Sequence, residues 1–158
     1  MEELAKRVGK RLKSSRAMLV TAESCTGGWV AQAVTSVAGS SDWFERGFVT
    51  YSDDSKQELL GVRRDTLARH GAVSEETARE MAQGALARSK GTVALAVTGV
   101  AGPGGGSGAK PVGTVCFAWA SRHDVKSETH RFSGNRERVR RQSVIRALEG
   151  VLEQLAGG

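Results

Sequence analysis

Ser24 lies in a short polar segment, residues 21–28 (TAESCTGG), between an apolar run and a helical pattern of apolar residues. This order predicts a strand, a tight turn and a helix, so that the serine stands beside free backbone N–H groups at the positive end of a helix dipole. Such groups can bind a phosphate, or the oxyanion that forms when a serine attacks a carbonyl. The simpler interpretation is that Ser24 or Thr26 caps the helix and the glycines form the turn.

Tyr51 and Lys56 also have side chains that could take part in chemistry, at the end of a predicted strand and shortly after it. With Ser24 they are compatible with a hydrolase in which a lysine takes the serine proton. A lysine acts as a base only when its surroundings lower its pKa from about 10.4 to about 7–8. The alternative is a solvated lysine on an exposed helix.

A glycine-rich segment, residues 98–108 (TGVAGPGGGSG), follows an apolar run that has the length of a central strand. Ligands of open α/β sheets bind beyond the carboxyl ends of strands, and glycines let backbone N–H groups approach an anion closely. The spacing excludes both the G-x-x-x-x-G-K-[ST] and the G-x-G-x-x-G phosphate loops. The segment is therefore either a ligand-binding loop of another kind or a flexible loop without a ligand.

The cysteines and histidines have no spacing that predicts a metal site. Cys25 and Cys116 form no disulfide framework, which favours a reducing, cytoplasmic compartment. Cys25 could itself be a nucleophile, but neighbouring side chains of an extended segment point opposite ways, so at most one of Ser24 and Cys25 faces the pocket. Near the start of the last helix, one or two arginines could reach a ligand phosphate.

Strands and helices alternate along the chain, which predicts one α/β sandwich domain over residues 1–158 with a mixed sheet. The last two strands are expected to form an antiparallel pair. We expect helices over about residues 3–14, 29–38, 56–60, 66–71, 75–90 and 136–155, and strands over 17–22, 46–51, 92–97, 112–120 and 125–132.

The formal net charge of +6 over 158 residues raises the question of nucleic-acid binding. The charge is spread along the chain, and the aromatic residues, at 5%, do not interleave with the basic ones as a stacking platform requires. We therefore expect an anionic small molecule as the ligand and no nucleic acid. We also expect no membrane association, because no apolar run approaches about 20 residues and the N-terminus is typical of an amphipathic helix, not of a signal peptide.

Five segments together resemble one family: residues 22–28 (AESCTGG), 48–52 (FVTYS) with Lys56, 71–74 (GAVS), 98–103 (TGVAGP) and 110–115 (KPVGTV). In this order and over almost the whole chain, they are similar to the CinA C-terminal domain family, which includes nicotinamide mononucleotide deamidases. The resemblance implies a single-domain α/β/α sandwich with a mixed, mostly parallel sheet. It also implies hydrolysis of the nicotinamide mononucleotide carboxamide to nicotinic acid mononucleotide and ammonia, in pyridine nucleotide salvage.

The resemblance implies no cofactor and no metal, and a nucleotide as the substrate. Members occur alone or behind a larger N-terminal domain, for which 158 residues leave no room, so we expect the stand-alone type. A homodimer is expected as the commonest oligomeric state.

Position by position, the resemblance makes Ser24 the nucleophile and Tyr51 and Lys56 the residues that activate it. Backbone N–H groups near Thr26 and Gly27 are then expected to hold the oxyanion. The residues expected to contact the substrate are Glu23, Thr26, Gly27, Gly28, Thr98, Gly99, Ala101, Gly102, Pro103, Gly104, Gly105, Arg136 and Arg140.

One position departs from the family pattern. The family stretch Gly-Asp-Arg is Gly134-Asn135-Arg136 here. Asparagine can still cap a helix, so the replacement is expected to remove a charge contact and to leave the fold unchanged.

Two other functions remain open on the sequence. A nucleotide-phosphate-binding regulatory module would keep the pocket without amidase activity. A DNA-associated accessory protein is suggested by the basic charge and the family's historical name, and a binding curve that depends steeply on salt would support it.

Overall fold

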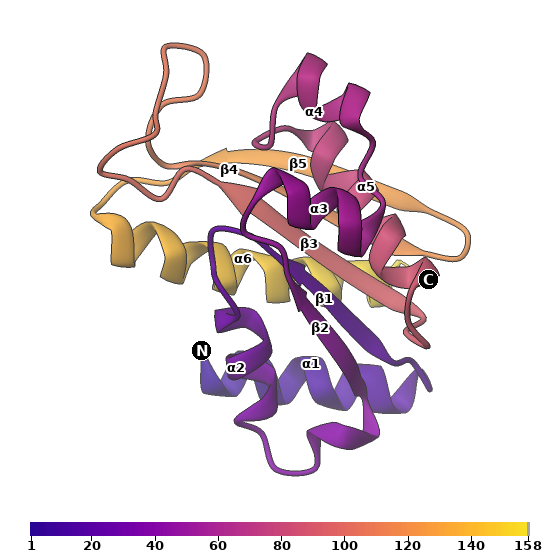
Figure 1. Ribbon diagram of the computed structural model, residues 1–158. Coiled ribbons are helices and arrows are strands. Elements are labelled where there is room, and N and C mark those ends of the chain that lie inside the picture. The colour runs from indigo at the N-terminus through magenta and orange to yellow at the C-terminus, as the bar shows by residue number, and fades with distance from the viewer. Residues whose placement is uncertain (158) are drawn as a thin grey trace.

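The computed structural model describes residues 1–157 (Figure 1), so the last residue of the predicted domain, at position 158, lies outside the described residues. The alternation of helices and strands follows the prediction. In chain order the elements are α1 (Glu2–Ser14), β1 (Leu19–Glu23), α2 (Trp29–Thr35), the 3₁₀ turn η1 (Ser40–Asp42), β2 (Phe44–Val49), α3 (Asp53–Leu60), α4 (Arg64–His70), α5 (Glu75–Ala87), β3 (Val93–Gly99), β4 (Thr114–Ser121), β5 (Val125–Arg131) and α6 (Arg136–Ala156).

The five strands form one sheet in the order β2-β1-β3-β4-β5. β1 pairs in parallel with β2 and β3, whereas β3–β4 and β4–β5 are antiparallel pairs. Within residues 1–157, β4 is thus the strand that runs against the other four, and the sheet is mixed and mostly parallel as predicted. β3 occupies the centre, which agrees with its almost continuous burial.

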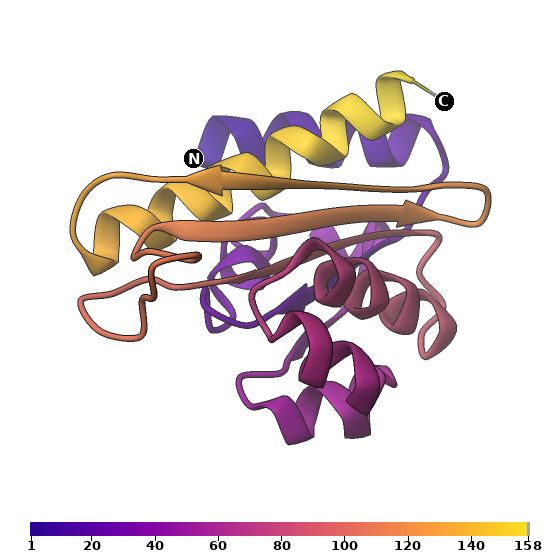
Figure 2. The ribbon, with the colours of Figure 1, turned by 90° about the horizontal axis from the view of Figure 1, so that it is seen from above.

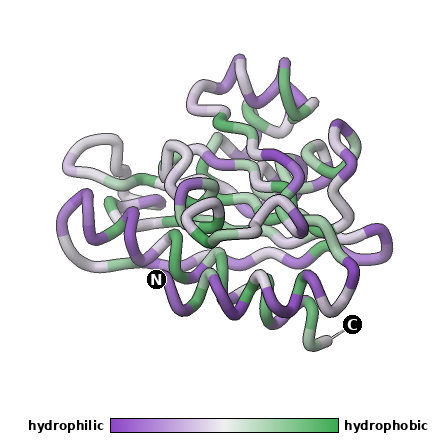
Figure 3. The backbone as a smooth tube through the Cα atoms, turned by 90° about the horizontal axis from the view of Figure 1, so that it is seen from below, coloured by the Kyte–Doolittle hydropathy of each residue, from purple (hydrophilic) through white to green (hydrophobic). Residues whose placement is uncertain are grey.

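Helices cover both faces of the sheet, which confirms the three-layer architecture. One core lies between the sheet and α1, α2 and α6, and the other lies between the sheet and the helices from α3 to α5. Figure 2 shows α1 and α6 on one side of the strands and α3, α4 and α5 on the other. Along α1 and α6, hydrophobic and hydrophilic positions alternate at helical spacing (Figure 3), because one stripe of each helix packs on the sheet.

Close packing of α3 on α5 depends on a glycine. A Cβ atom built on Gly84 of α5 would lie 1.8 Å from the carbonyl oxygen of Leu60, the last residue of α3. Because that neighbour is backbone, only a residue without a side chain lets the two helices approach this closely. The contact holds α3 against α5, and α3 carries Lys56.

The carboxyl ends of β1, β2 and β3 meet at one edge of the sheet, because these strands are parallel neighbours. β5 ends at the same edge, where its Arg131 pairs with Thr114 at the start of β4, and α6 begins a few residues later. The predicted strand at 112–120 starts only at Thr114, because Gly113 adopts a left-handed φ of 95° that interrupts extended backbone. The topology therefore brings the polar turn, the glycine-rich segment and the start of α6 together.

None of the helices in the described residues combines the length and the apolar character needed to cross a membrane.

Candidate active site

Ser24 follows β1 directly and begins the turn that leads into α2. Its N–H still belongs to the sheet, because it donates to the carbonyl oxygen of Val97 at 2.9 Å, and its own carbonyl accepts from Gly27 N–H at 3.0 Å. Gly27 and Gly28 have φ values of 59° and 104°, in the left-handed region that favours glycine. The turn predicted from the sequence is therefore formed by these two glycines, and it presents a serine whose exposed fraction is 8%.

The side chain of Lys56 reaches Ser24 from α3. Its Nζ donates to Ser24 Oγ at 3.1 Å and to the carbonyl oxygen of Thr50 at 2.9 Å. α3 starts in a capping box formed by Ser52 and Ser55, which fixes the first turn of the helix that carries the lysine. The structure thus joins two residues that are 32 positions apart in the sequence.

Lys56 is almost fully buried, with an exposed fraction of 1%. Burial lowers its pKa below the usual lysine value, because the charged form loses water, while the charge of nearby Asp53 opposes the shift in part. The alternative of a solvated lysine is therefore excluded. A buried amine with a lowered pKa, in contact with a serine hydroxyl, is the arrangement that a lysine general base requires.

Tyr51 lies at the rim of the site and not beside the serine–lysine pair. Its side chain is 62% exposed, and its hydroxyl accepts a hydrogen bond from Arg136 Nη2 at 3.2 Å. Within residues 1–157 no hydrogen bond joins Tyr51 to Ser24 or Lys56. Arg136 Nη1 also donates to the carbonyl oxygen of Gly102 at 2.8 Å, so this arginine connects the end of β2, the glycine-rich segment and the start of α6.

Glu23 is buried beneath the turn, with no exposed surface. Its carboxylate accepts from Thr26 Oγ1 at 2.6 Å, from Val30 N–H at 2.8 Å and from Ala31 N–H at 3.0 Å. It therefore satisfies the free N–H groups at the start of α2 from inside the protein. This position does not favour the substrate contact predicted for Glu23, and it gives the residue a role in holding the turn.

Two further predicted contacts are engaged within the protein. Gly27 N–H is bonded to the Ser24 carbonyl, so it is not free for an oxyanion, whereas Thr26 N–H has no acceptor in the described residues. Thr98 Oγ1 donates to the carbonyl oxygen of Ala72 at 2.9 Å and ties the end of β3 to the segment before α5. Of the remaining predicted positions in the glycine-rich segment, Gly99 is half-buried and Ala101 and Gly102 are buried, whereas residues 103–105 are exposed at the rim.

The structure does not favour Cys25 as the nucleophile. Its side chain is 6% exposed, and burial raises the pKa of its thiol to about 12. The thiol is therefore protonated near neutral pH, and a protonated thiol is a poor nucleophile. The described residues contain no group of His, Cys, Asp and Glu that could hold a metal ion.

Asn135 keeps the capping role expected of it. Its Oδ1 accepts from Arg138 N–H at 2.9 Å, at the start of α6. The departure from the family pattern is therefore accommodated in the fold, because asparagine and aspartate accept the same bond at this position.

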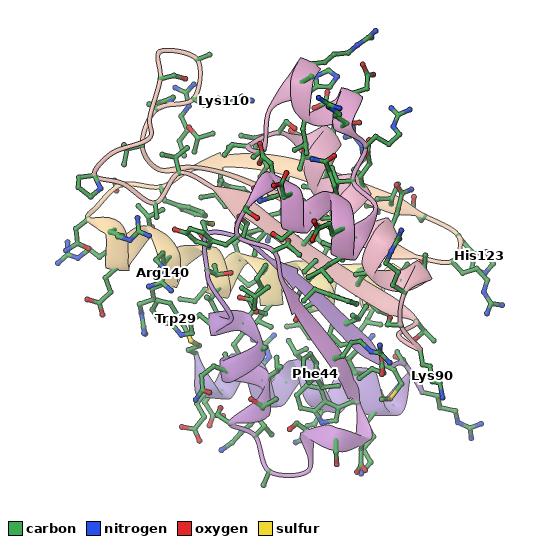
Figure 4. The ribbon with its side chains drawn as sticks, in the orientation of Figure 1. Trp29, Phe44, Lys90, Lys110, His123 and Arg140 are labelled. Carbon is green, nitrogen blue, oxygen red and sulfur yellow. The ribbon has the colours of Figure 1, made fainter. Side chains whose placement is uncertain are left out.

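Arg140 engages the turn by contacts that the sequence did not indicate. Its Nε donates to the carbonyl oxygen of Cys25 at 3.1 Å and its Nη2 to that of Thr26 at 3.0 Å. Figure 4 shows Arg140 near Trp29, whose ring centroid lies 5.4 Å from the arginine Cζ. The sequence predicted that Arg140 contacts the substrate. It did not predict that the guanidinium group donates to backbone carbonyls of the protein.

Known proteins match this chain along almost its whole length. Residues 1–155 match the family model described as the CinA C-terminal domain. A protein of Escherichia coli (strain K12) named nicotinamide-nucleotide amidohydrolase PncC is 52% identical over 153 residues, which cover 96% of this chain and 93% of that protein. The protein of the same name from Pseudomonas putida is 53% identical over 150 residues, with coverage of 95% and 94%.

A solved structure shares the fold closely. The crystal structure of the competence/damage inducible protein CihA from Agrobacterium tumefaciens superposes with a TM-score of 0.94 at 48% identity. The match covers 98% of this chain and 94% of that one.

Proposed function

This chain belongs to the CinA C-terminal domain family, and we propose that it is an amidohydrolase that converts nicotinamide mononucleotide to nicotinic acid mononucleotide and ammonia, in pyridine nucleotide salvage. The names of the relatives that match almost end to end support the reaction. One observation supports the chemistry above all others. The buried amine of Lys56, whose pKa is lowered, lies 3.1 Å from the Ser24 hydroxyl.

In the proposed first step, neutral Lys56 takes the proton of Ser24 while Oγ attacks the carboxamide carbon. The carbonyl oxygen becomes an oxyanion, and Thr26 N–H is the backbone donor proposed to stabilise it. The C–N bond then breaks, the lysine ammonium returns its proton to the leaving nitrogen, and ammonia departs. One well-placed oxyanion donor contributes about 10²–10³ in rate in other hydrolases.

In the second step, water hydrolyses the acyl-enzyme. Lys56 takes a proton from the water as its oxygen attacks the ester carbon, and the proton then passes to Ser24 as the ester bond breaks. Thr50 supports the lysine in both steps, because its carbonyl accepts a bond from Nζ and leaves the amine lone pair directed at the serine. No metal or cofactor enters this scheme.

The substrate phosphate is assigned to the rim, where Arg136 lies between Tyr51 and Gly102. Arg136 is exposed, and guanidinium groups bind phosphate oxygens in a bidentate manner. Tyr51 is proposed to assist Lys56, which requires its side chain to turn from Arg136 toward Ser24 when the substrate binds. If Tyr51 assists Lys56, Tyr51→Phe lowers kcat. If Tyr51 only orients Arg136, the same variant raises KM instead.

We also propose a homodimer in the cytoplasm. Val49, Tyr51, Leu59 and Val112 are large apolar or aromatic residues that are exposed in the single chain, and a second copy would cover them. Both cysteines are free thiols, as expected in a reducing compartment. Light scattering during size-exclusion chromatography tests the dimer, and cell fractionation tests the compartment.

Ammonia release from nicotinamide mononucleotide tests the function, with Ser24→Ala and Lys56→Met as variants. We expect release by the natural protein and a loss of several orders of magnitude in both variants. Release by Ser24→Ala at the natural rate would remove the serine from the mechanism. If the natural protein binds the nucleotide and releases no ammonia, it is a binding module. If it binds DNA in a salt-dependent manner and does not bind the nucleotide, the DNA-associated accessory role is favoured.

A further inference from the structure

The guanidinium group of Arg140 holds two consecutive carbonyls next to the nucleophile. Arg140 lies near the start of α6, and it bonds the carbonyl oxygens of Cys25 and Thr26 at 3.1 and 3.0 Å. Its Cζ also lies over the ring of Trp29, the first residue of α2. One side chain therefore connects α6 with the turn after Ser24 and with the helix that follows it.

These bonds fix the direction of the peptide groups in the turn. Both peptide bonds are trans, so each carbonyl and the N–H that follows it point to opposite sides. Since the carbonyl of Cys25 points to Arg140, the N–H of Thr26 points away from it. The N–H of Gly27 also points away and donates to the carbonyl of Ser24, so Thr26 N–H is the donor of this pair that has no acceptor in the described residues.

A second anchor holds Thr26 by its side chain. Thr26 Oγ1 donates to the buried carboxylate of Glu23 at 2.6 Å. A bond to the side chain does not fix the plane of the peptide group between Cys25 and Thr26, and the next peptide group, between Thr26 and Gly27, is flanked by a glycine, which resists rotation less than other residues do. Arg140 supplies the missing constraint, because it binds the carbonyls themselves.

The geometry points to Arg140 as a positioning residue, which keeps the N–H of Thr26 directed at the oxyanion that forms on the substrate. This inference rests on the proposed amidohydrolase function. It also separates two arginines that the sequence placed together as substrate contacts. Arg136 is left to bind phosphate and to act on KM, whereas Arg140, whose Nε and Nη2 are bonded to the turn, acts on kcat.

The test compares Arg140→Met with Arg141→Met. Arg141 is the next residue of α6, it is exposed, and its side chain makes no hydrogen bond or ion pair within residues 1–157, so its substitution is a control with the same loss of charge. Since removal of one oxyanion donor costs about 10²–10³ in kcat, a misdirected donor should cost about tenfold or more, with KM changed by less than about twofold. Arg140→Lys should recover part of the rate, because an ammonium group can still bind one of the carbonyls.

Hydrogen exchange gives a second measurement that does not depend on activity. We expect faster amide exchange over residues 24–28 in Arg140→Met than in the natural protein, and no change there in Arg141→Met. If Arg140→Met fails to fold, Arg140→Lys carries both measurements, with a smaller expected change.

Two results would overturn the inference: an unchanged kcat in Arg140→Met, or unchanged exchange over residues 24–28. An unchanged kcat together with a raised KM would return Arg140 to the substrate contacts. A natural protein that releases no ammonia would instead refute the proposed function and with it the catalytic role of Arg140. The exchange comparison would in that case still decide whether Arg140 holds the turn.

Discussion

The neutral amine of Lys56 should carry the activity, so that the rate follows its titration and removing the amine lowers the rate strongly at every pH. In the natural protein, burial lowers the pKa of Lys56, so the fraction of neutral amine grows with pH through a midpoint below about 10.4. We therefore expect kcat/KM to rise with pH along that titration. Loss of a general base costs about 10²–10⁴ in rate, which corresponds to about 3–5 kcal/mol of transition-state stabilisation.

The same shift predicts how stability depends on pH. Between the lowered pKa of the folded state and the unfolded value of about 10.4, the unfolded chain binds a proton that the folded protein does not. The contribution of Lys56 to the free energy of unfolding therefore rises with pH across this window and is smallest below it. Lys56→Met lacks this contribution, so the difference in stability between variant and natural protein should change in favour of the natural protein as pH rises.

Two assays and one control examine this reasoning. Initial rates of ammonia release give the pH profile of kcat/KM, and urea unfolding at several pH values gives the stability. Lys56→Arg is the control, because it keeps a positive charge that is not lost at any working pH. We expect Lys56→Arg to be inactive throughout.

The outcomes that would refute the assignment are specific. A Lys56→Met protein that is folded and retains the natural rate would show that another group takes the serine proton. An active Lys56→Arg protein would show that the lysine contributes charge and not proton transfer. A kcat/KM that falls with rising pH over the window would contradict the sign of the titration.

Three further substitutions, the first with a matched control, test other parts of the structure. Gly84→Ala should destabilise the protein by about 1–3 kcal/mol in urea unfolding and lower kcat, because its Cβ would meet the Leu60 carbonyl that ends α3. Gly104→Ala, with nothing within 4 Å of its Cβ, should leave stability unchanged, and an equal loss of stability in both variants would contradict the packing argument. Glu23→Gln should lower the free energy of unfolding by about 1–3 kcal/mol, seen as a lower urea midpoint at constant m-value, because its amide cannot accept all three bonds of the carboxylate; an unchanged midpoint would contradict this. Arg136→Met should raise KM more than it lowers kcat, and a pure loss of kcat would place the phosphate elsewhere.

Local sequence determined the elements and several of their ends. The continuous apolar run at residues 92–97 predicted the central strand, and the structure places β3 there. The glycines at 27 and 28 predicted a turn, and both adopt left-handed backbone. Asn135 caps α6 as predicted, and Ser74 caps α5 in the same way, because a cap needs only the backbone a few residues away.

The surroundings of each predicted side chain were decided by the tertiary structure. The sequence predicted that Tyr51 and Lys56 both activate Ser24. In the structure, packing buries the lysine against Ser24 and leaves the tyrosine at the rim with Arg136. It also named Arg140 as a substrate contact, whereas α6 directs the guanidinium to the carbonyls of the turn. Sequence periodicity gives the face on which a residue lies. A lowered pKa or a bond to a distant carbonyl depends on which elements meet at that face, and this follows only from how strands and helices pack over long distances in the chain.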